Sequence, residues 1–204
     1  MHISWLGNSA IKIQTRPFDN DIVIIIDPYK PATGDFPRNL APDIGLYTHS
    51  EENSITLSDN AFILSTPGEV ENKGVLITAV QGHGPNEIMF RLDSEQLSVA
   101  HLGMSKKVLT DEQLGLLSGV DILILPVGGN DCYDAETASK VISEIEPRII
   151  IPMAFKSDND QKAEPISVFL KEMGTPMGEP EKKIIIKKKD LPTEETKVII
   201  LSKE

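Results

Sequence analysis

The fold of this chain is organised around residues 44–54, which read Ile44-Gly-Leu-Tyr-Thr-His-Ser-Glu-Glu-Asn-Ser54. The apolar first half is typical of a short buried strand, and the polar second half is typical of the loop that follows it. A histidine and two acidic residues therefore stand where a strand ends. Because loops carried on rigid strands hold functional side chains in place, we interpret the rest of the chain as a scaffold for this strand end.

Length and composition narrow the classes of function. The 204 residues suit a single domain that spans 1–204 and can bury a sizeable core. The formal net charge of −11 disfavours nucleic acid as a partner, because phosphates repel an acidic surface. No basic leader or long apolar run opens the chain, and Cys132 is its one cysteine. We therefore expect a cytoplasmic protein with neither a membrane partner nor an internal disulfide.

The order of the predicted elements changes half-way along the chain. Strands dominate up to residue 102, and no helix of ordinary length is expected before residue 110. Helices are then predicted over 110–118, 134–146 and 165–173, the first with Thr110 as N-cap and Gln113 completing a capping box. They alternate with strands over 121–125, 148–153, 183–187 and 198–201. Lysines on both sides of Ile184–Ile186 indicate an edge strand that is protected from unwanted pairing.

This order predicts an α+β fold in which two sheets are stacked face to face with helices packed outside them. The loops at one end of such a sandwich would gather side chains from strands that are far apart in the sequence. We expect that end to carry Asp27, His49, His83, the Gly103 region, Gly128, Gly129 and Ala154.

Several short motifs resemble one known family. They include Trp5-Leu-Gly-Asn-Ser-Ala10, Ile25-Ile-Asp-Pro-Tyr29, Thr48-His49, Pro67-Gly-Glu-Val-Glu71 and His101-Leu-Gly103, and they continue with Asp121-Ile-Leu-Ile-Leu-Pro-Val-Gly-Gly129 and Glu146-Pro-Arg-Ile-Ile-Ile-Pro-Met153. In order and spacing, they resemble the metallo-β-lactamase fold superfamily, in the branch of metal-dependent hydrolases that includes the L-ascorbate-6-phosphate lactonases. The resemblance implies a four-layer αββα sandwich.

The resemblance also implies a metal centre, which this chain matches only in part. Active members hold two metal ions with a His-x-His-x-Asp-His run, a later histidine, a bridging aspartate and a last histidine. On this chain the first and later histidines fall on His49 and His83. The other positions carry Glu51, Asn53, Ser54, Met104 and Ala154, and the histidine often present in the opening Gly-His-Ser motif is Asn8.

The retained residues could hold one metal ion but not two. His49, Glu51 and His83 offer two imidazoles and a carboxylate, a set that suits one zinc ion or an iron-type facial triad. Asn53, Ser54, Met104 and Ala154 stand at the lost ligand positions, and none of them is a strong zinc ligand. Supporting roles around the cleft are implied for Asp27, His101, Gly128 and Gly129, with Asp27 tying down the loop at His49.

Three hypotheses follow for the function. The first is a protein that has lost the dinuclear centre, carries no metal cofactor and binds a small molecule or a protein without catalysis. The alternative is a divergent hydrolase that uses one zinc ion on His49, Glu51 and His83. A third class is a structural subunit of a larger assembly.

Overall fold

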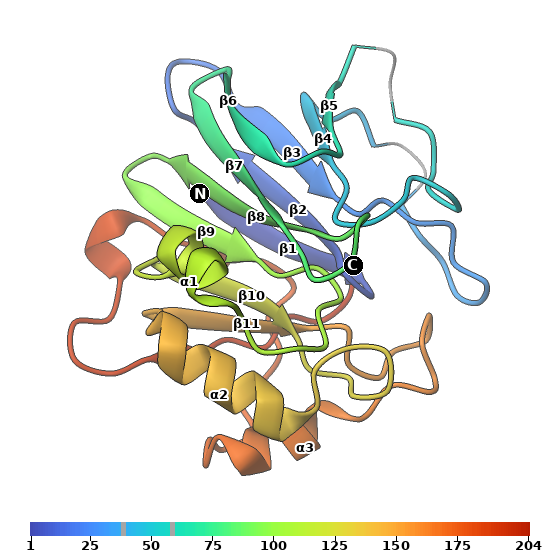
Figure 1. The fold of residues 1–204 in the computed structure, drawn as a ribbon, viewed down its shortest axis with the longest axis vertical. Helices are drawn as coiled ribbons and strands as arrows, with labels where there is room; N and C mark the ends of the chain where they lie inside the picture. The colour runs from blue at the N-terminus through green and yellow to red at the C-terminus, as the bar shows by residue number, and fades with distance from the viewer. Residues whose placement is uncertain (38–39, 58–59) are drawn as a thin grey trace.

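Two β-sheets packed face to face form the centre of the structure, a computed structural model that describes residues 1–37, 40–57 and 60–204 (Figure 1). The six-stranded sheet has the order β12 (Ile184–Ile185), β1 (His2–Gly7), β2 (Ala10–Thr15), β3 (Ile22–Ile26), β4 (Ile44–Leu46) and β5 (Phe62–Leu64). The seven-stranded sheet has the order β13 (Lys197–Val198), β11 (Ile149–Met153), β10 (Ile122–Pro126), β9 (Leu97–His101), β8 (Ile88–Ser94), β7 (Val75–Gln81) and β6 (Gly68–Asn72). The predicted α+β sandwich is confirmed.

Both sheets are mixed, and in each the early strands pair antiparallel and the later strands pair in parallel. In the six-stranded sheet β1, β2 and β3 pair antiparallel with one another, whereas β3, β4 and β5 pair in parallel. In the other sheet β6 to β9 are antiparallel, and β9, β10, β11 and β13 are parallel. Because β3 and β4 are parallel neighbours, their C-terminal ends lie at the same end of the sandwich. The residues that follow these strands, Asp27 and Tyr47–His49, are therefore close to each other.

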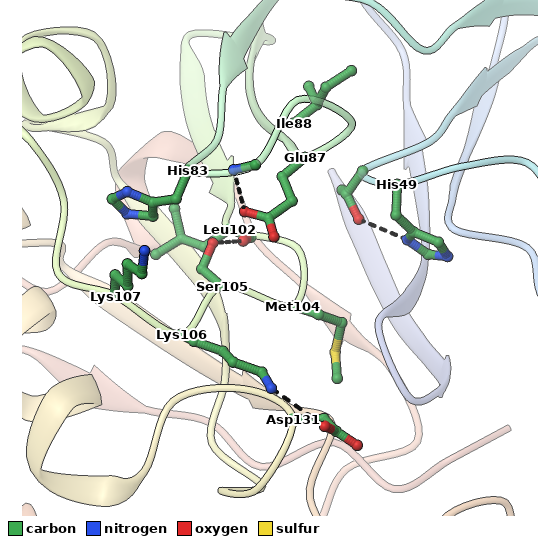
Figure 2. Close-up of a pocket in the computed structure, with 12 residues that line it drawn as sticks. His49, His83, Glu87, Ile88, Leu102, Met104, Ser105, Lys106, Lys107 and Asp131 are labelled. Carbon is green, nitrogen blue, oxygen red and sulfur yellow. Dashed lines mark hydrogen bonds and ion pairs between the residues drawn. The ribbon is translucent and has the colours of Figure 1, made fainter.

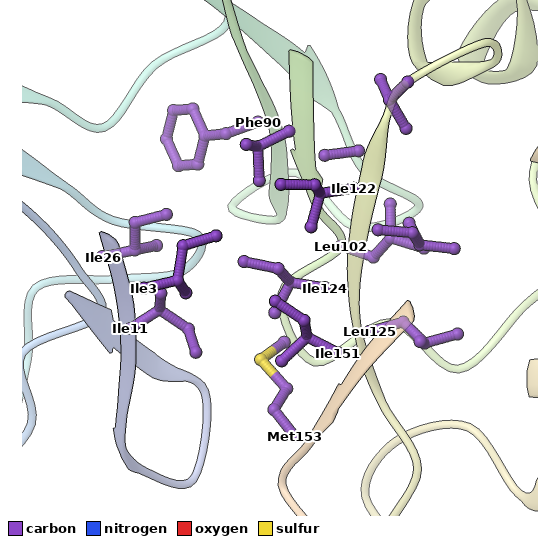
Figure 3. Close-up of a cluster of buried hydrophobic side chains, with 14 of the residues drawn as sticks. Ile3, Ile11, Ile26, Phe90, Leu102, Ile122, Ile124, Leu125, Ile151 and Met153 are labelled. Atoms are coloured by element: carbon purple, nitrogen blue, oxygen red, sulfur yellow. The ribbon is translucent and has the colours of Figure 1, made fainter. Parts of the chain in front are cut away.

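The core lies between the sheets and is dominated by isoleucine. Figure 3 shows Ile3, Ile11 and Ile26 from the six-stranded sheet facing Phe90 and Ile124 from the seven-stranded sheet. All five are essentially inaccessible to solvent. Fully burying one such side chain contributes about 1.5–3 kcal/mol, so this layer fixes the relative position of the two sheets and of the strand ends that they carry.

The helices cover the outer face of the seven-stranded sheet. These are α1 (Asp111–Leu117), α2 (Ala135–Ile145) and α3 (Ile166–Glu172), with α2 packed against both α3 and β10. The predicted capping box at Thr110 and Gln113 is present at the start of α1. Along α2 the buried side chains are Ala135, Ala138, Val141, Ile142 and Ile145, which recur at the spacing of one helix face.

The outer face of the six-stranded sheet is covered differently. There Leu6, Ala10 and Ile25 form a second small cluster under Tyr29 and Phe36, with Val23 and Leu40 packed at its side. Tyr29 and Phe36 make an edge-to-face contact with their ring centroids 4.9 Å apart. Within the described residues, the proline-rich loop that carries Tyr29 and Phe36 therefore covers this part of the outer face.

One strand of the structure was not predicted, and two others are shorter than predicted. The edge strand β6, Gly68–Asn72, was not predicted, because Glu69 and Glu71 give it a polar sequence. The two C-terminal strands are shorter than expected, at Ile184–Ile185 and Lys197–Val198. As the flanking lysines predicted, β12 lies at the edge of its sheet. None of the helices in the described part of the chain is long and apolar enough to cross a membrane.

Candidate functional site

Hydrogen bonds between loops join several strand ends into one site. The Thr48 carbonyl, just after β4, accepts from the Ile88 amide at 2.8 Å, which ties the six-stranded sheet to the start of β8. The Ala154 amide, just after β11, donates to the Asn8 carbonyl at 3.1 Å. These bonds bring the end of β4 to the start of β8, and the end of β11 to the turn between β1 and β2.

Asp27 and Thr48 form the buried floor of this site. Asp27 is 1% exposed and accepts from the Thr48 amide at 2.7 Å and from the Thr48 hydroxyl at 2.5 Å. Because that hydroxyl has a single proton, the 3.2 Å contact between Thr48 Oγ1 and His49 Nδ1 requires the imidazole to donate. His49 therefore carries a proton on Nδ1, which also lies 3.5 Å from Asp27.

His101 is a structural histidine beneath this network. Its ring is fully buried, and its Nε2 donates to the Ser9 carbonyl at 3.0 Å while its Nδ1 accepts from the Gly103 amide at 3.2 Å. Both nitrogens are therefore satisfied by the backbone. Burial lowers the pKa of His101, although the nearby Asp27 acts in the opposite direction. A neutral histidine with both nitrogens in use has no lone pair left for a metal ion.

A cavity of about 370 Å³ opens beside His49 and is lined by side chains from both sheets. Figure 2 shows His49 on one side of the cavity and His83 with Lys107 on the other. Met104 lies below them, at the side where Lys106 bonds to Asp131 at 3.3 Å. The lining is both apolar and charged, which suits a small organic molecule.

The acidic loop after His49 turns away from this cavity. Glu51 and Ser54 line a separate groove together with Tyr47 and Thr56. A turn directs them there, because the Ser54 amide bonds to the Glu51 carbonyl at 3.1 Å and Asn53 has a left-handed backbone with φ of +64°. The Asn53 carbonyl also accepts from Lys30, so the turn is fixed against the neighbouring loop.

Met104 and Ala154 both have structural roles. Met104 is half-buried and packs against the main core cluster. Ala154 is 1% exposed and keeps a left-handed backbone with φ of +56°. Gly128 lies so close to it that a Cβ atom at Gly128 would stand 2.0 Å from the Ala154 carbonyl oxygen. Gly129 also has a left-handed φ, of +64°, and directs the chain into the loop before α2.

These donors do not fit a two-metal centre. Across residues 1–37, 40–57 and 60–204, no group of three or more His, Cys, Asp or Glu side chains is placed to hold a metal ion. The three ligands predicted for a single metal are not brought together either. His49 and His83 line different sides of one cavity, and Glu51 faces another groove because the turn at 51–54 carries it there.

Sequence reasoning missed several residues of the cavity. Glu87 shares it with the two histidines, and Ser105, Lys106, Lys107 and Asp131 complete its polar lining. The Lys106-Lys107 pair is the one signal that could have been noticed, because it follows closely on the end of β9 at His101. Glu87 could not have been identified, since its position depends on the turn between β7 and β8.

Comparison with known proteins supports the assignment suggested by this fold. The β-lactamase superfamily domain matches residues 2–154. The chain belongs to the metallo-β-lactamase superfamily. A UPF0173 metal-dependent hydrolase of Methanopyrus kandleri is 23% identical, and the match covers 76% of this chain and 84% of that protein. One from Thermoplasma acidophilum is 25% identical, over 81% of this chain and 88% of that protein.

A solved structure agrees with the superfamily assignment along the whole chain. A candidate Zn-dependent hydrolase of the metallo-β-lactamase superfamily from Thermotoga maritima superposes with a TM-score of 0.82 at 25% identity, covering 99% of this chain and all of that one. The metallohydrolase Igni18 of Ignicoccus hospitalis shares the fold, with a TM-score of 0.67 at 16% identity. This protein is thus a member of a metal-dependent hydrolase-like family.

Proposed function

We propose that this chain is a ligand-binding member of its hydrolase family, which binds a small molecule in the cavity beside His49 without a dinuclear metal centre and without two-metal catalysis. One observation carries the proposal. The positions of the bridging aspartate and of the last histidine hold Met104 and Ala154, and both are integrated into the packing of the fold. A thioether and a methyl group cannot bridge two hard cations.

The features that remain around the cavity suit binding. Asp27 and Thr48 are rigidly held, and the cavity has a volume within the usual range for small-molecule sites. Leu102, Met104 and Ile88 offer an apolar wall, while His49 and the two lysines offer polar contacts. A protein partner is the other option for a non-catalytic member, and the concave shape of the site favours a small molecule over it.

Metal analysis tests the proposal directly. We expect the protein, purified without chelator and then incubated with excess zinc, to retain well under one equivalent per chain after desalting. The double variant Met104→Asp/Ala154→His is the matched control, because it restores two strong ligands on the same scaffold and should raise the retained zinc. One or more equivalents retained by the unmodified chain would overturn the proposal.

A second candidate function is a hydrolase with a single metal ion. It is favoured by the names of the relatives, which are metal-dependent hydrolases, and by the two histidines that line the cavity, His49 and His83. Under this hypothesis the chain retains one equivalent of metal, and both His49→Ala and His83→Ala lose it together with hydrolysis of 4-nitrophenyl acetate. Retention of metal by either variant would reject this candidate.

A further inference from the structure

One nitrogen atom of the His83 ring is buried. This Nε2 is shielded from solvent and makes no hydrogen bond with any of the residues that the structure describes. The turn that carries it is well fixed, because the Gly84 amide donates to Glu87 Oε2 at 2.9 Å and the Gln81 side chain donates to the Gly84 carbonyl at 2.6 Å. A buried polar group left without a partner is destabilising, so a ligand atom that bonded to this nitrogen would be stabilising.

Lys107 lines the same cavity as His83. Figure 2 shows the two side chains on the same side of the cavity. Lys106 is paired with Asp131, whereas Lys107 makes no ion pair with any residue in the described part of the chain. The backbone at Lys107 is held in place, because its carbonyl accepts from the Tyr133 hydroxyl at 3.0 Å.

We propose that His83 and Lys107 form a subsite for the anionic group of the cavity's ligand, which is a small organic monocarboxylate. This inference rests on the proposed function, since it names the ligand class of the same cavity. A carboxylate would accept from His83 Nε2–H and from the Lys107 ammonium group, and both are charge-assisted contacts. The same ammonium group repels a metal ion at His83, so the pair favours an anion over a cation.

The rest of the cavity limits the ligand to one negative charge and an apolar body. Glu87 and Asp131 also line the cavity, and their carboxylates oppose the entry of a dianion such as phosphate. Leu102, Ile88 and Met104 provide the apolar surface against which a short hydrocarbon or a ring would pack. An amphipathic monoanion satisfies both halves of this lining.

Benzoate and its neutral isostere benzamide test the charge requirement. The chain has four histidines, so the His83 imidazole proton resonances can be assigned in the full-length protein by comparison with a His83→Phe variant. We expect benzoate to shift the His83 resonances and to bind at least tenfold more tightly than benzamide. Inorganic phosphate at the same concentration should leave these resonances unchanged.

Variants separate the subsite from the cavity as a whole. Lys107→Met keeps the aliphatic stem and removes the charge, and it should weaken benzoate binding about tenfold while leaving benzamide binding unchanged. Lys140→Met is the matched control, because Lys140 lies on the exposed face of α2 in an ion pair with Glu136 and should behave as the unmodified chain does. If His83→Phe does not fold, the comparison of the two lysine variants still decides the question.

Other results would reject either the carboxylate subsite, the restriction to a monoanion or the proposed function. Equal binding of benzoate and benzamide, or no effect of Lys107→Met, would overturn the carboxylate subsite while supporting a ligand-binding cavity. Tighter binding of phosphate than of benzoate would overturn the restriction to a monoanion. If neither organic probe moves the His49 or His83 resonances at millimolar concentration and zinc does, the proposed function itself fails.

Discussion

The buried floor of the site and its solvent-facing wall differ in how their side chains are held. In the floor, Asp27, Thr48 and His101 are almost inaccessible and fully hydrogen-bonded. In the wall, Met104 lines the cavity together with charged side chains, and Glu51 lies in another groove. The floor is held by hydrogen bonds, whereas the wall is a mixture of apolar and charged side chains.

The cost of losing hydrogen bonds explains this difference. Removing a buried acceptor such as Asp27 leaves the Thr48 amide unsatisfied, with a penalty of about 1–3 kcal/mol. Met104, by contrast, has no hydrogen bond to lose, so a substitution there leaves the buried network of Asp27, Thr48 and His101 intact. The supporting network is therefore part of the scaffold, whatever side chains line the cavity.

Gly128→Ala should have the largest effect, because the Gly128 backbone packs directly against the Ala154 backbone. The new methyl group would stand 2.0 Å from the Ala154 carbonyl oxygen, which is backbone and cannot rotate away. We expect a loss of about 3 kcal/mol in the free energy of unfolding, measured by urea denaturation. Gly115→Ala in α1 is the control, since nothing lies within 4 Å of its Cβ position, and it should stabilise the protein by about 0.5–1 kcal/mol. Equal effects would show that the close approach at Gly128 can be relieved.

Asp27→Asn should have the next largest effect. The substitution keeps the shape of the side chain, and asparagine tolerates the left-handed backbone at this position, where φ is +50°. It replaces one acceptor oxygen with an amide NH2 group that faces Thr48. We expect a loss of about 2 kcal/mol in the free energy of unfolding, in the same urea measurement. Asp131→Asn, on an exposed side chain, should leave stability nearly unchanged. An unchanged free energy of unfolding in Asp27→Asn would mean that the floor is not held by this carboxylate.

The stability of the floor should also depend on pH through His101. Burial lowers the pKa of His101, so the unfolded chain binds this proton more readily than the folded protein does. The stabilisation is therefore complete above the unfolded pKa of about 6.5 and is lost as the pH falls below it, at up to about 1.4 kcal/mol per pH unit. Urea denaturation at pH 7.5 and 5.5 measures the change, and the non-titrating variant His101→Gln should show a smaller pH dependence. An unchanged pH dependence would remove His101 as its source.

The fold was readable from the sequence because its signals are local. The apolar run at Ile22–Ile26 and the capping box at Thr110 are decided by neighbouring residues, and both are present. The strand β6 was missed because its charged residues at an exposed edge do not alternate with strongly apolar ones. The loop layer over Ile25 could not be foreseen, since no periodic pattern marks a loop that packs by Tyr29 and Phe36.

The site was harder to predict from the sequence, because the positions of its side chains depend on turns. The residues directly at strand ends, Asp27 and His49, could be placed by counting along the strands. The direction of Glu51 depends on the left-handed Asn53, and the pairing of Lys106 with Asp131 joins two loops 25 residues apart. The sequence showed which ligand types were absent, but the side of the loop on which each remaining side chain lies is a property of the folded backbone.

Glu51→Gln should have the smallest effect and gives the sharpest test of the division between floor and wall. Glu51 is exposed and lines the groove of Tyr47 and Thr56, so removing its charge should change neither the free energy of unfolding nor the binding of benzoate in the cavity beside His49. Glu87→Gln is the comparison, because Glu87 shares that cavity and its carboxylate opposes an anion, so its neutralisation should tighten benzoate binding severalfold. Isothermal titration of both variants measures the difference. If instead Glu51→Gln changed benzoate binding and Glu87→Gln did not, the acidic loop would belong to the same site as His49, and the wall would still be built around the strand end at residues 44–54.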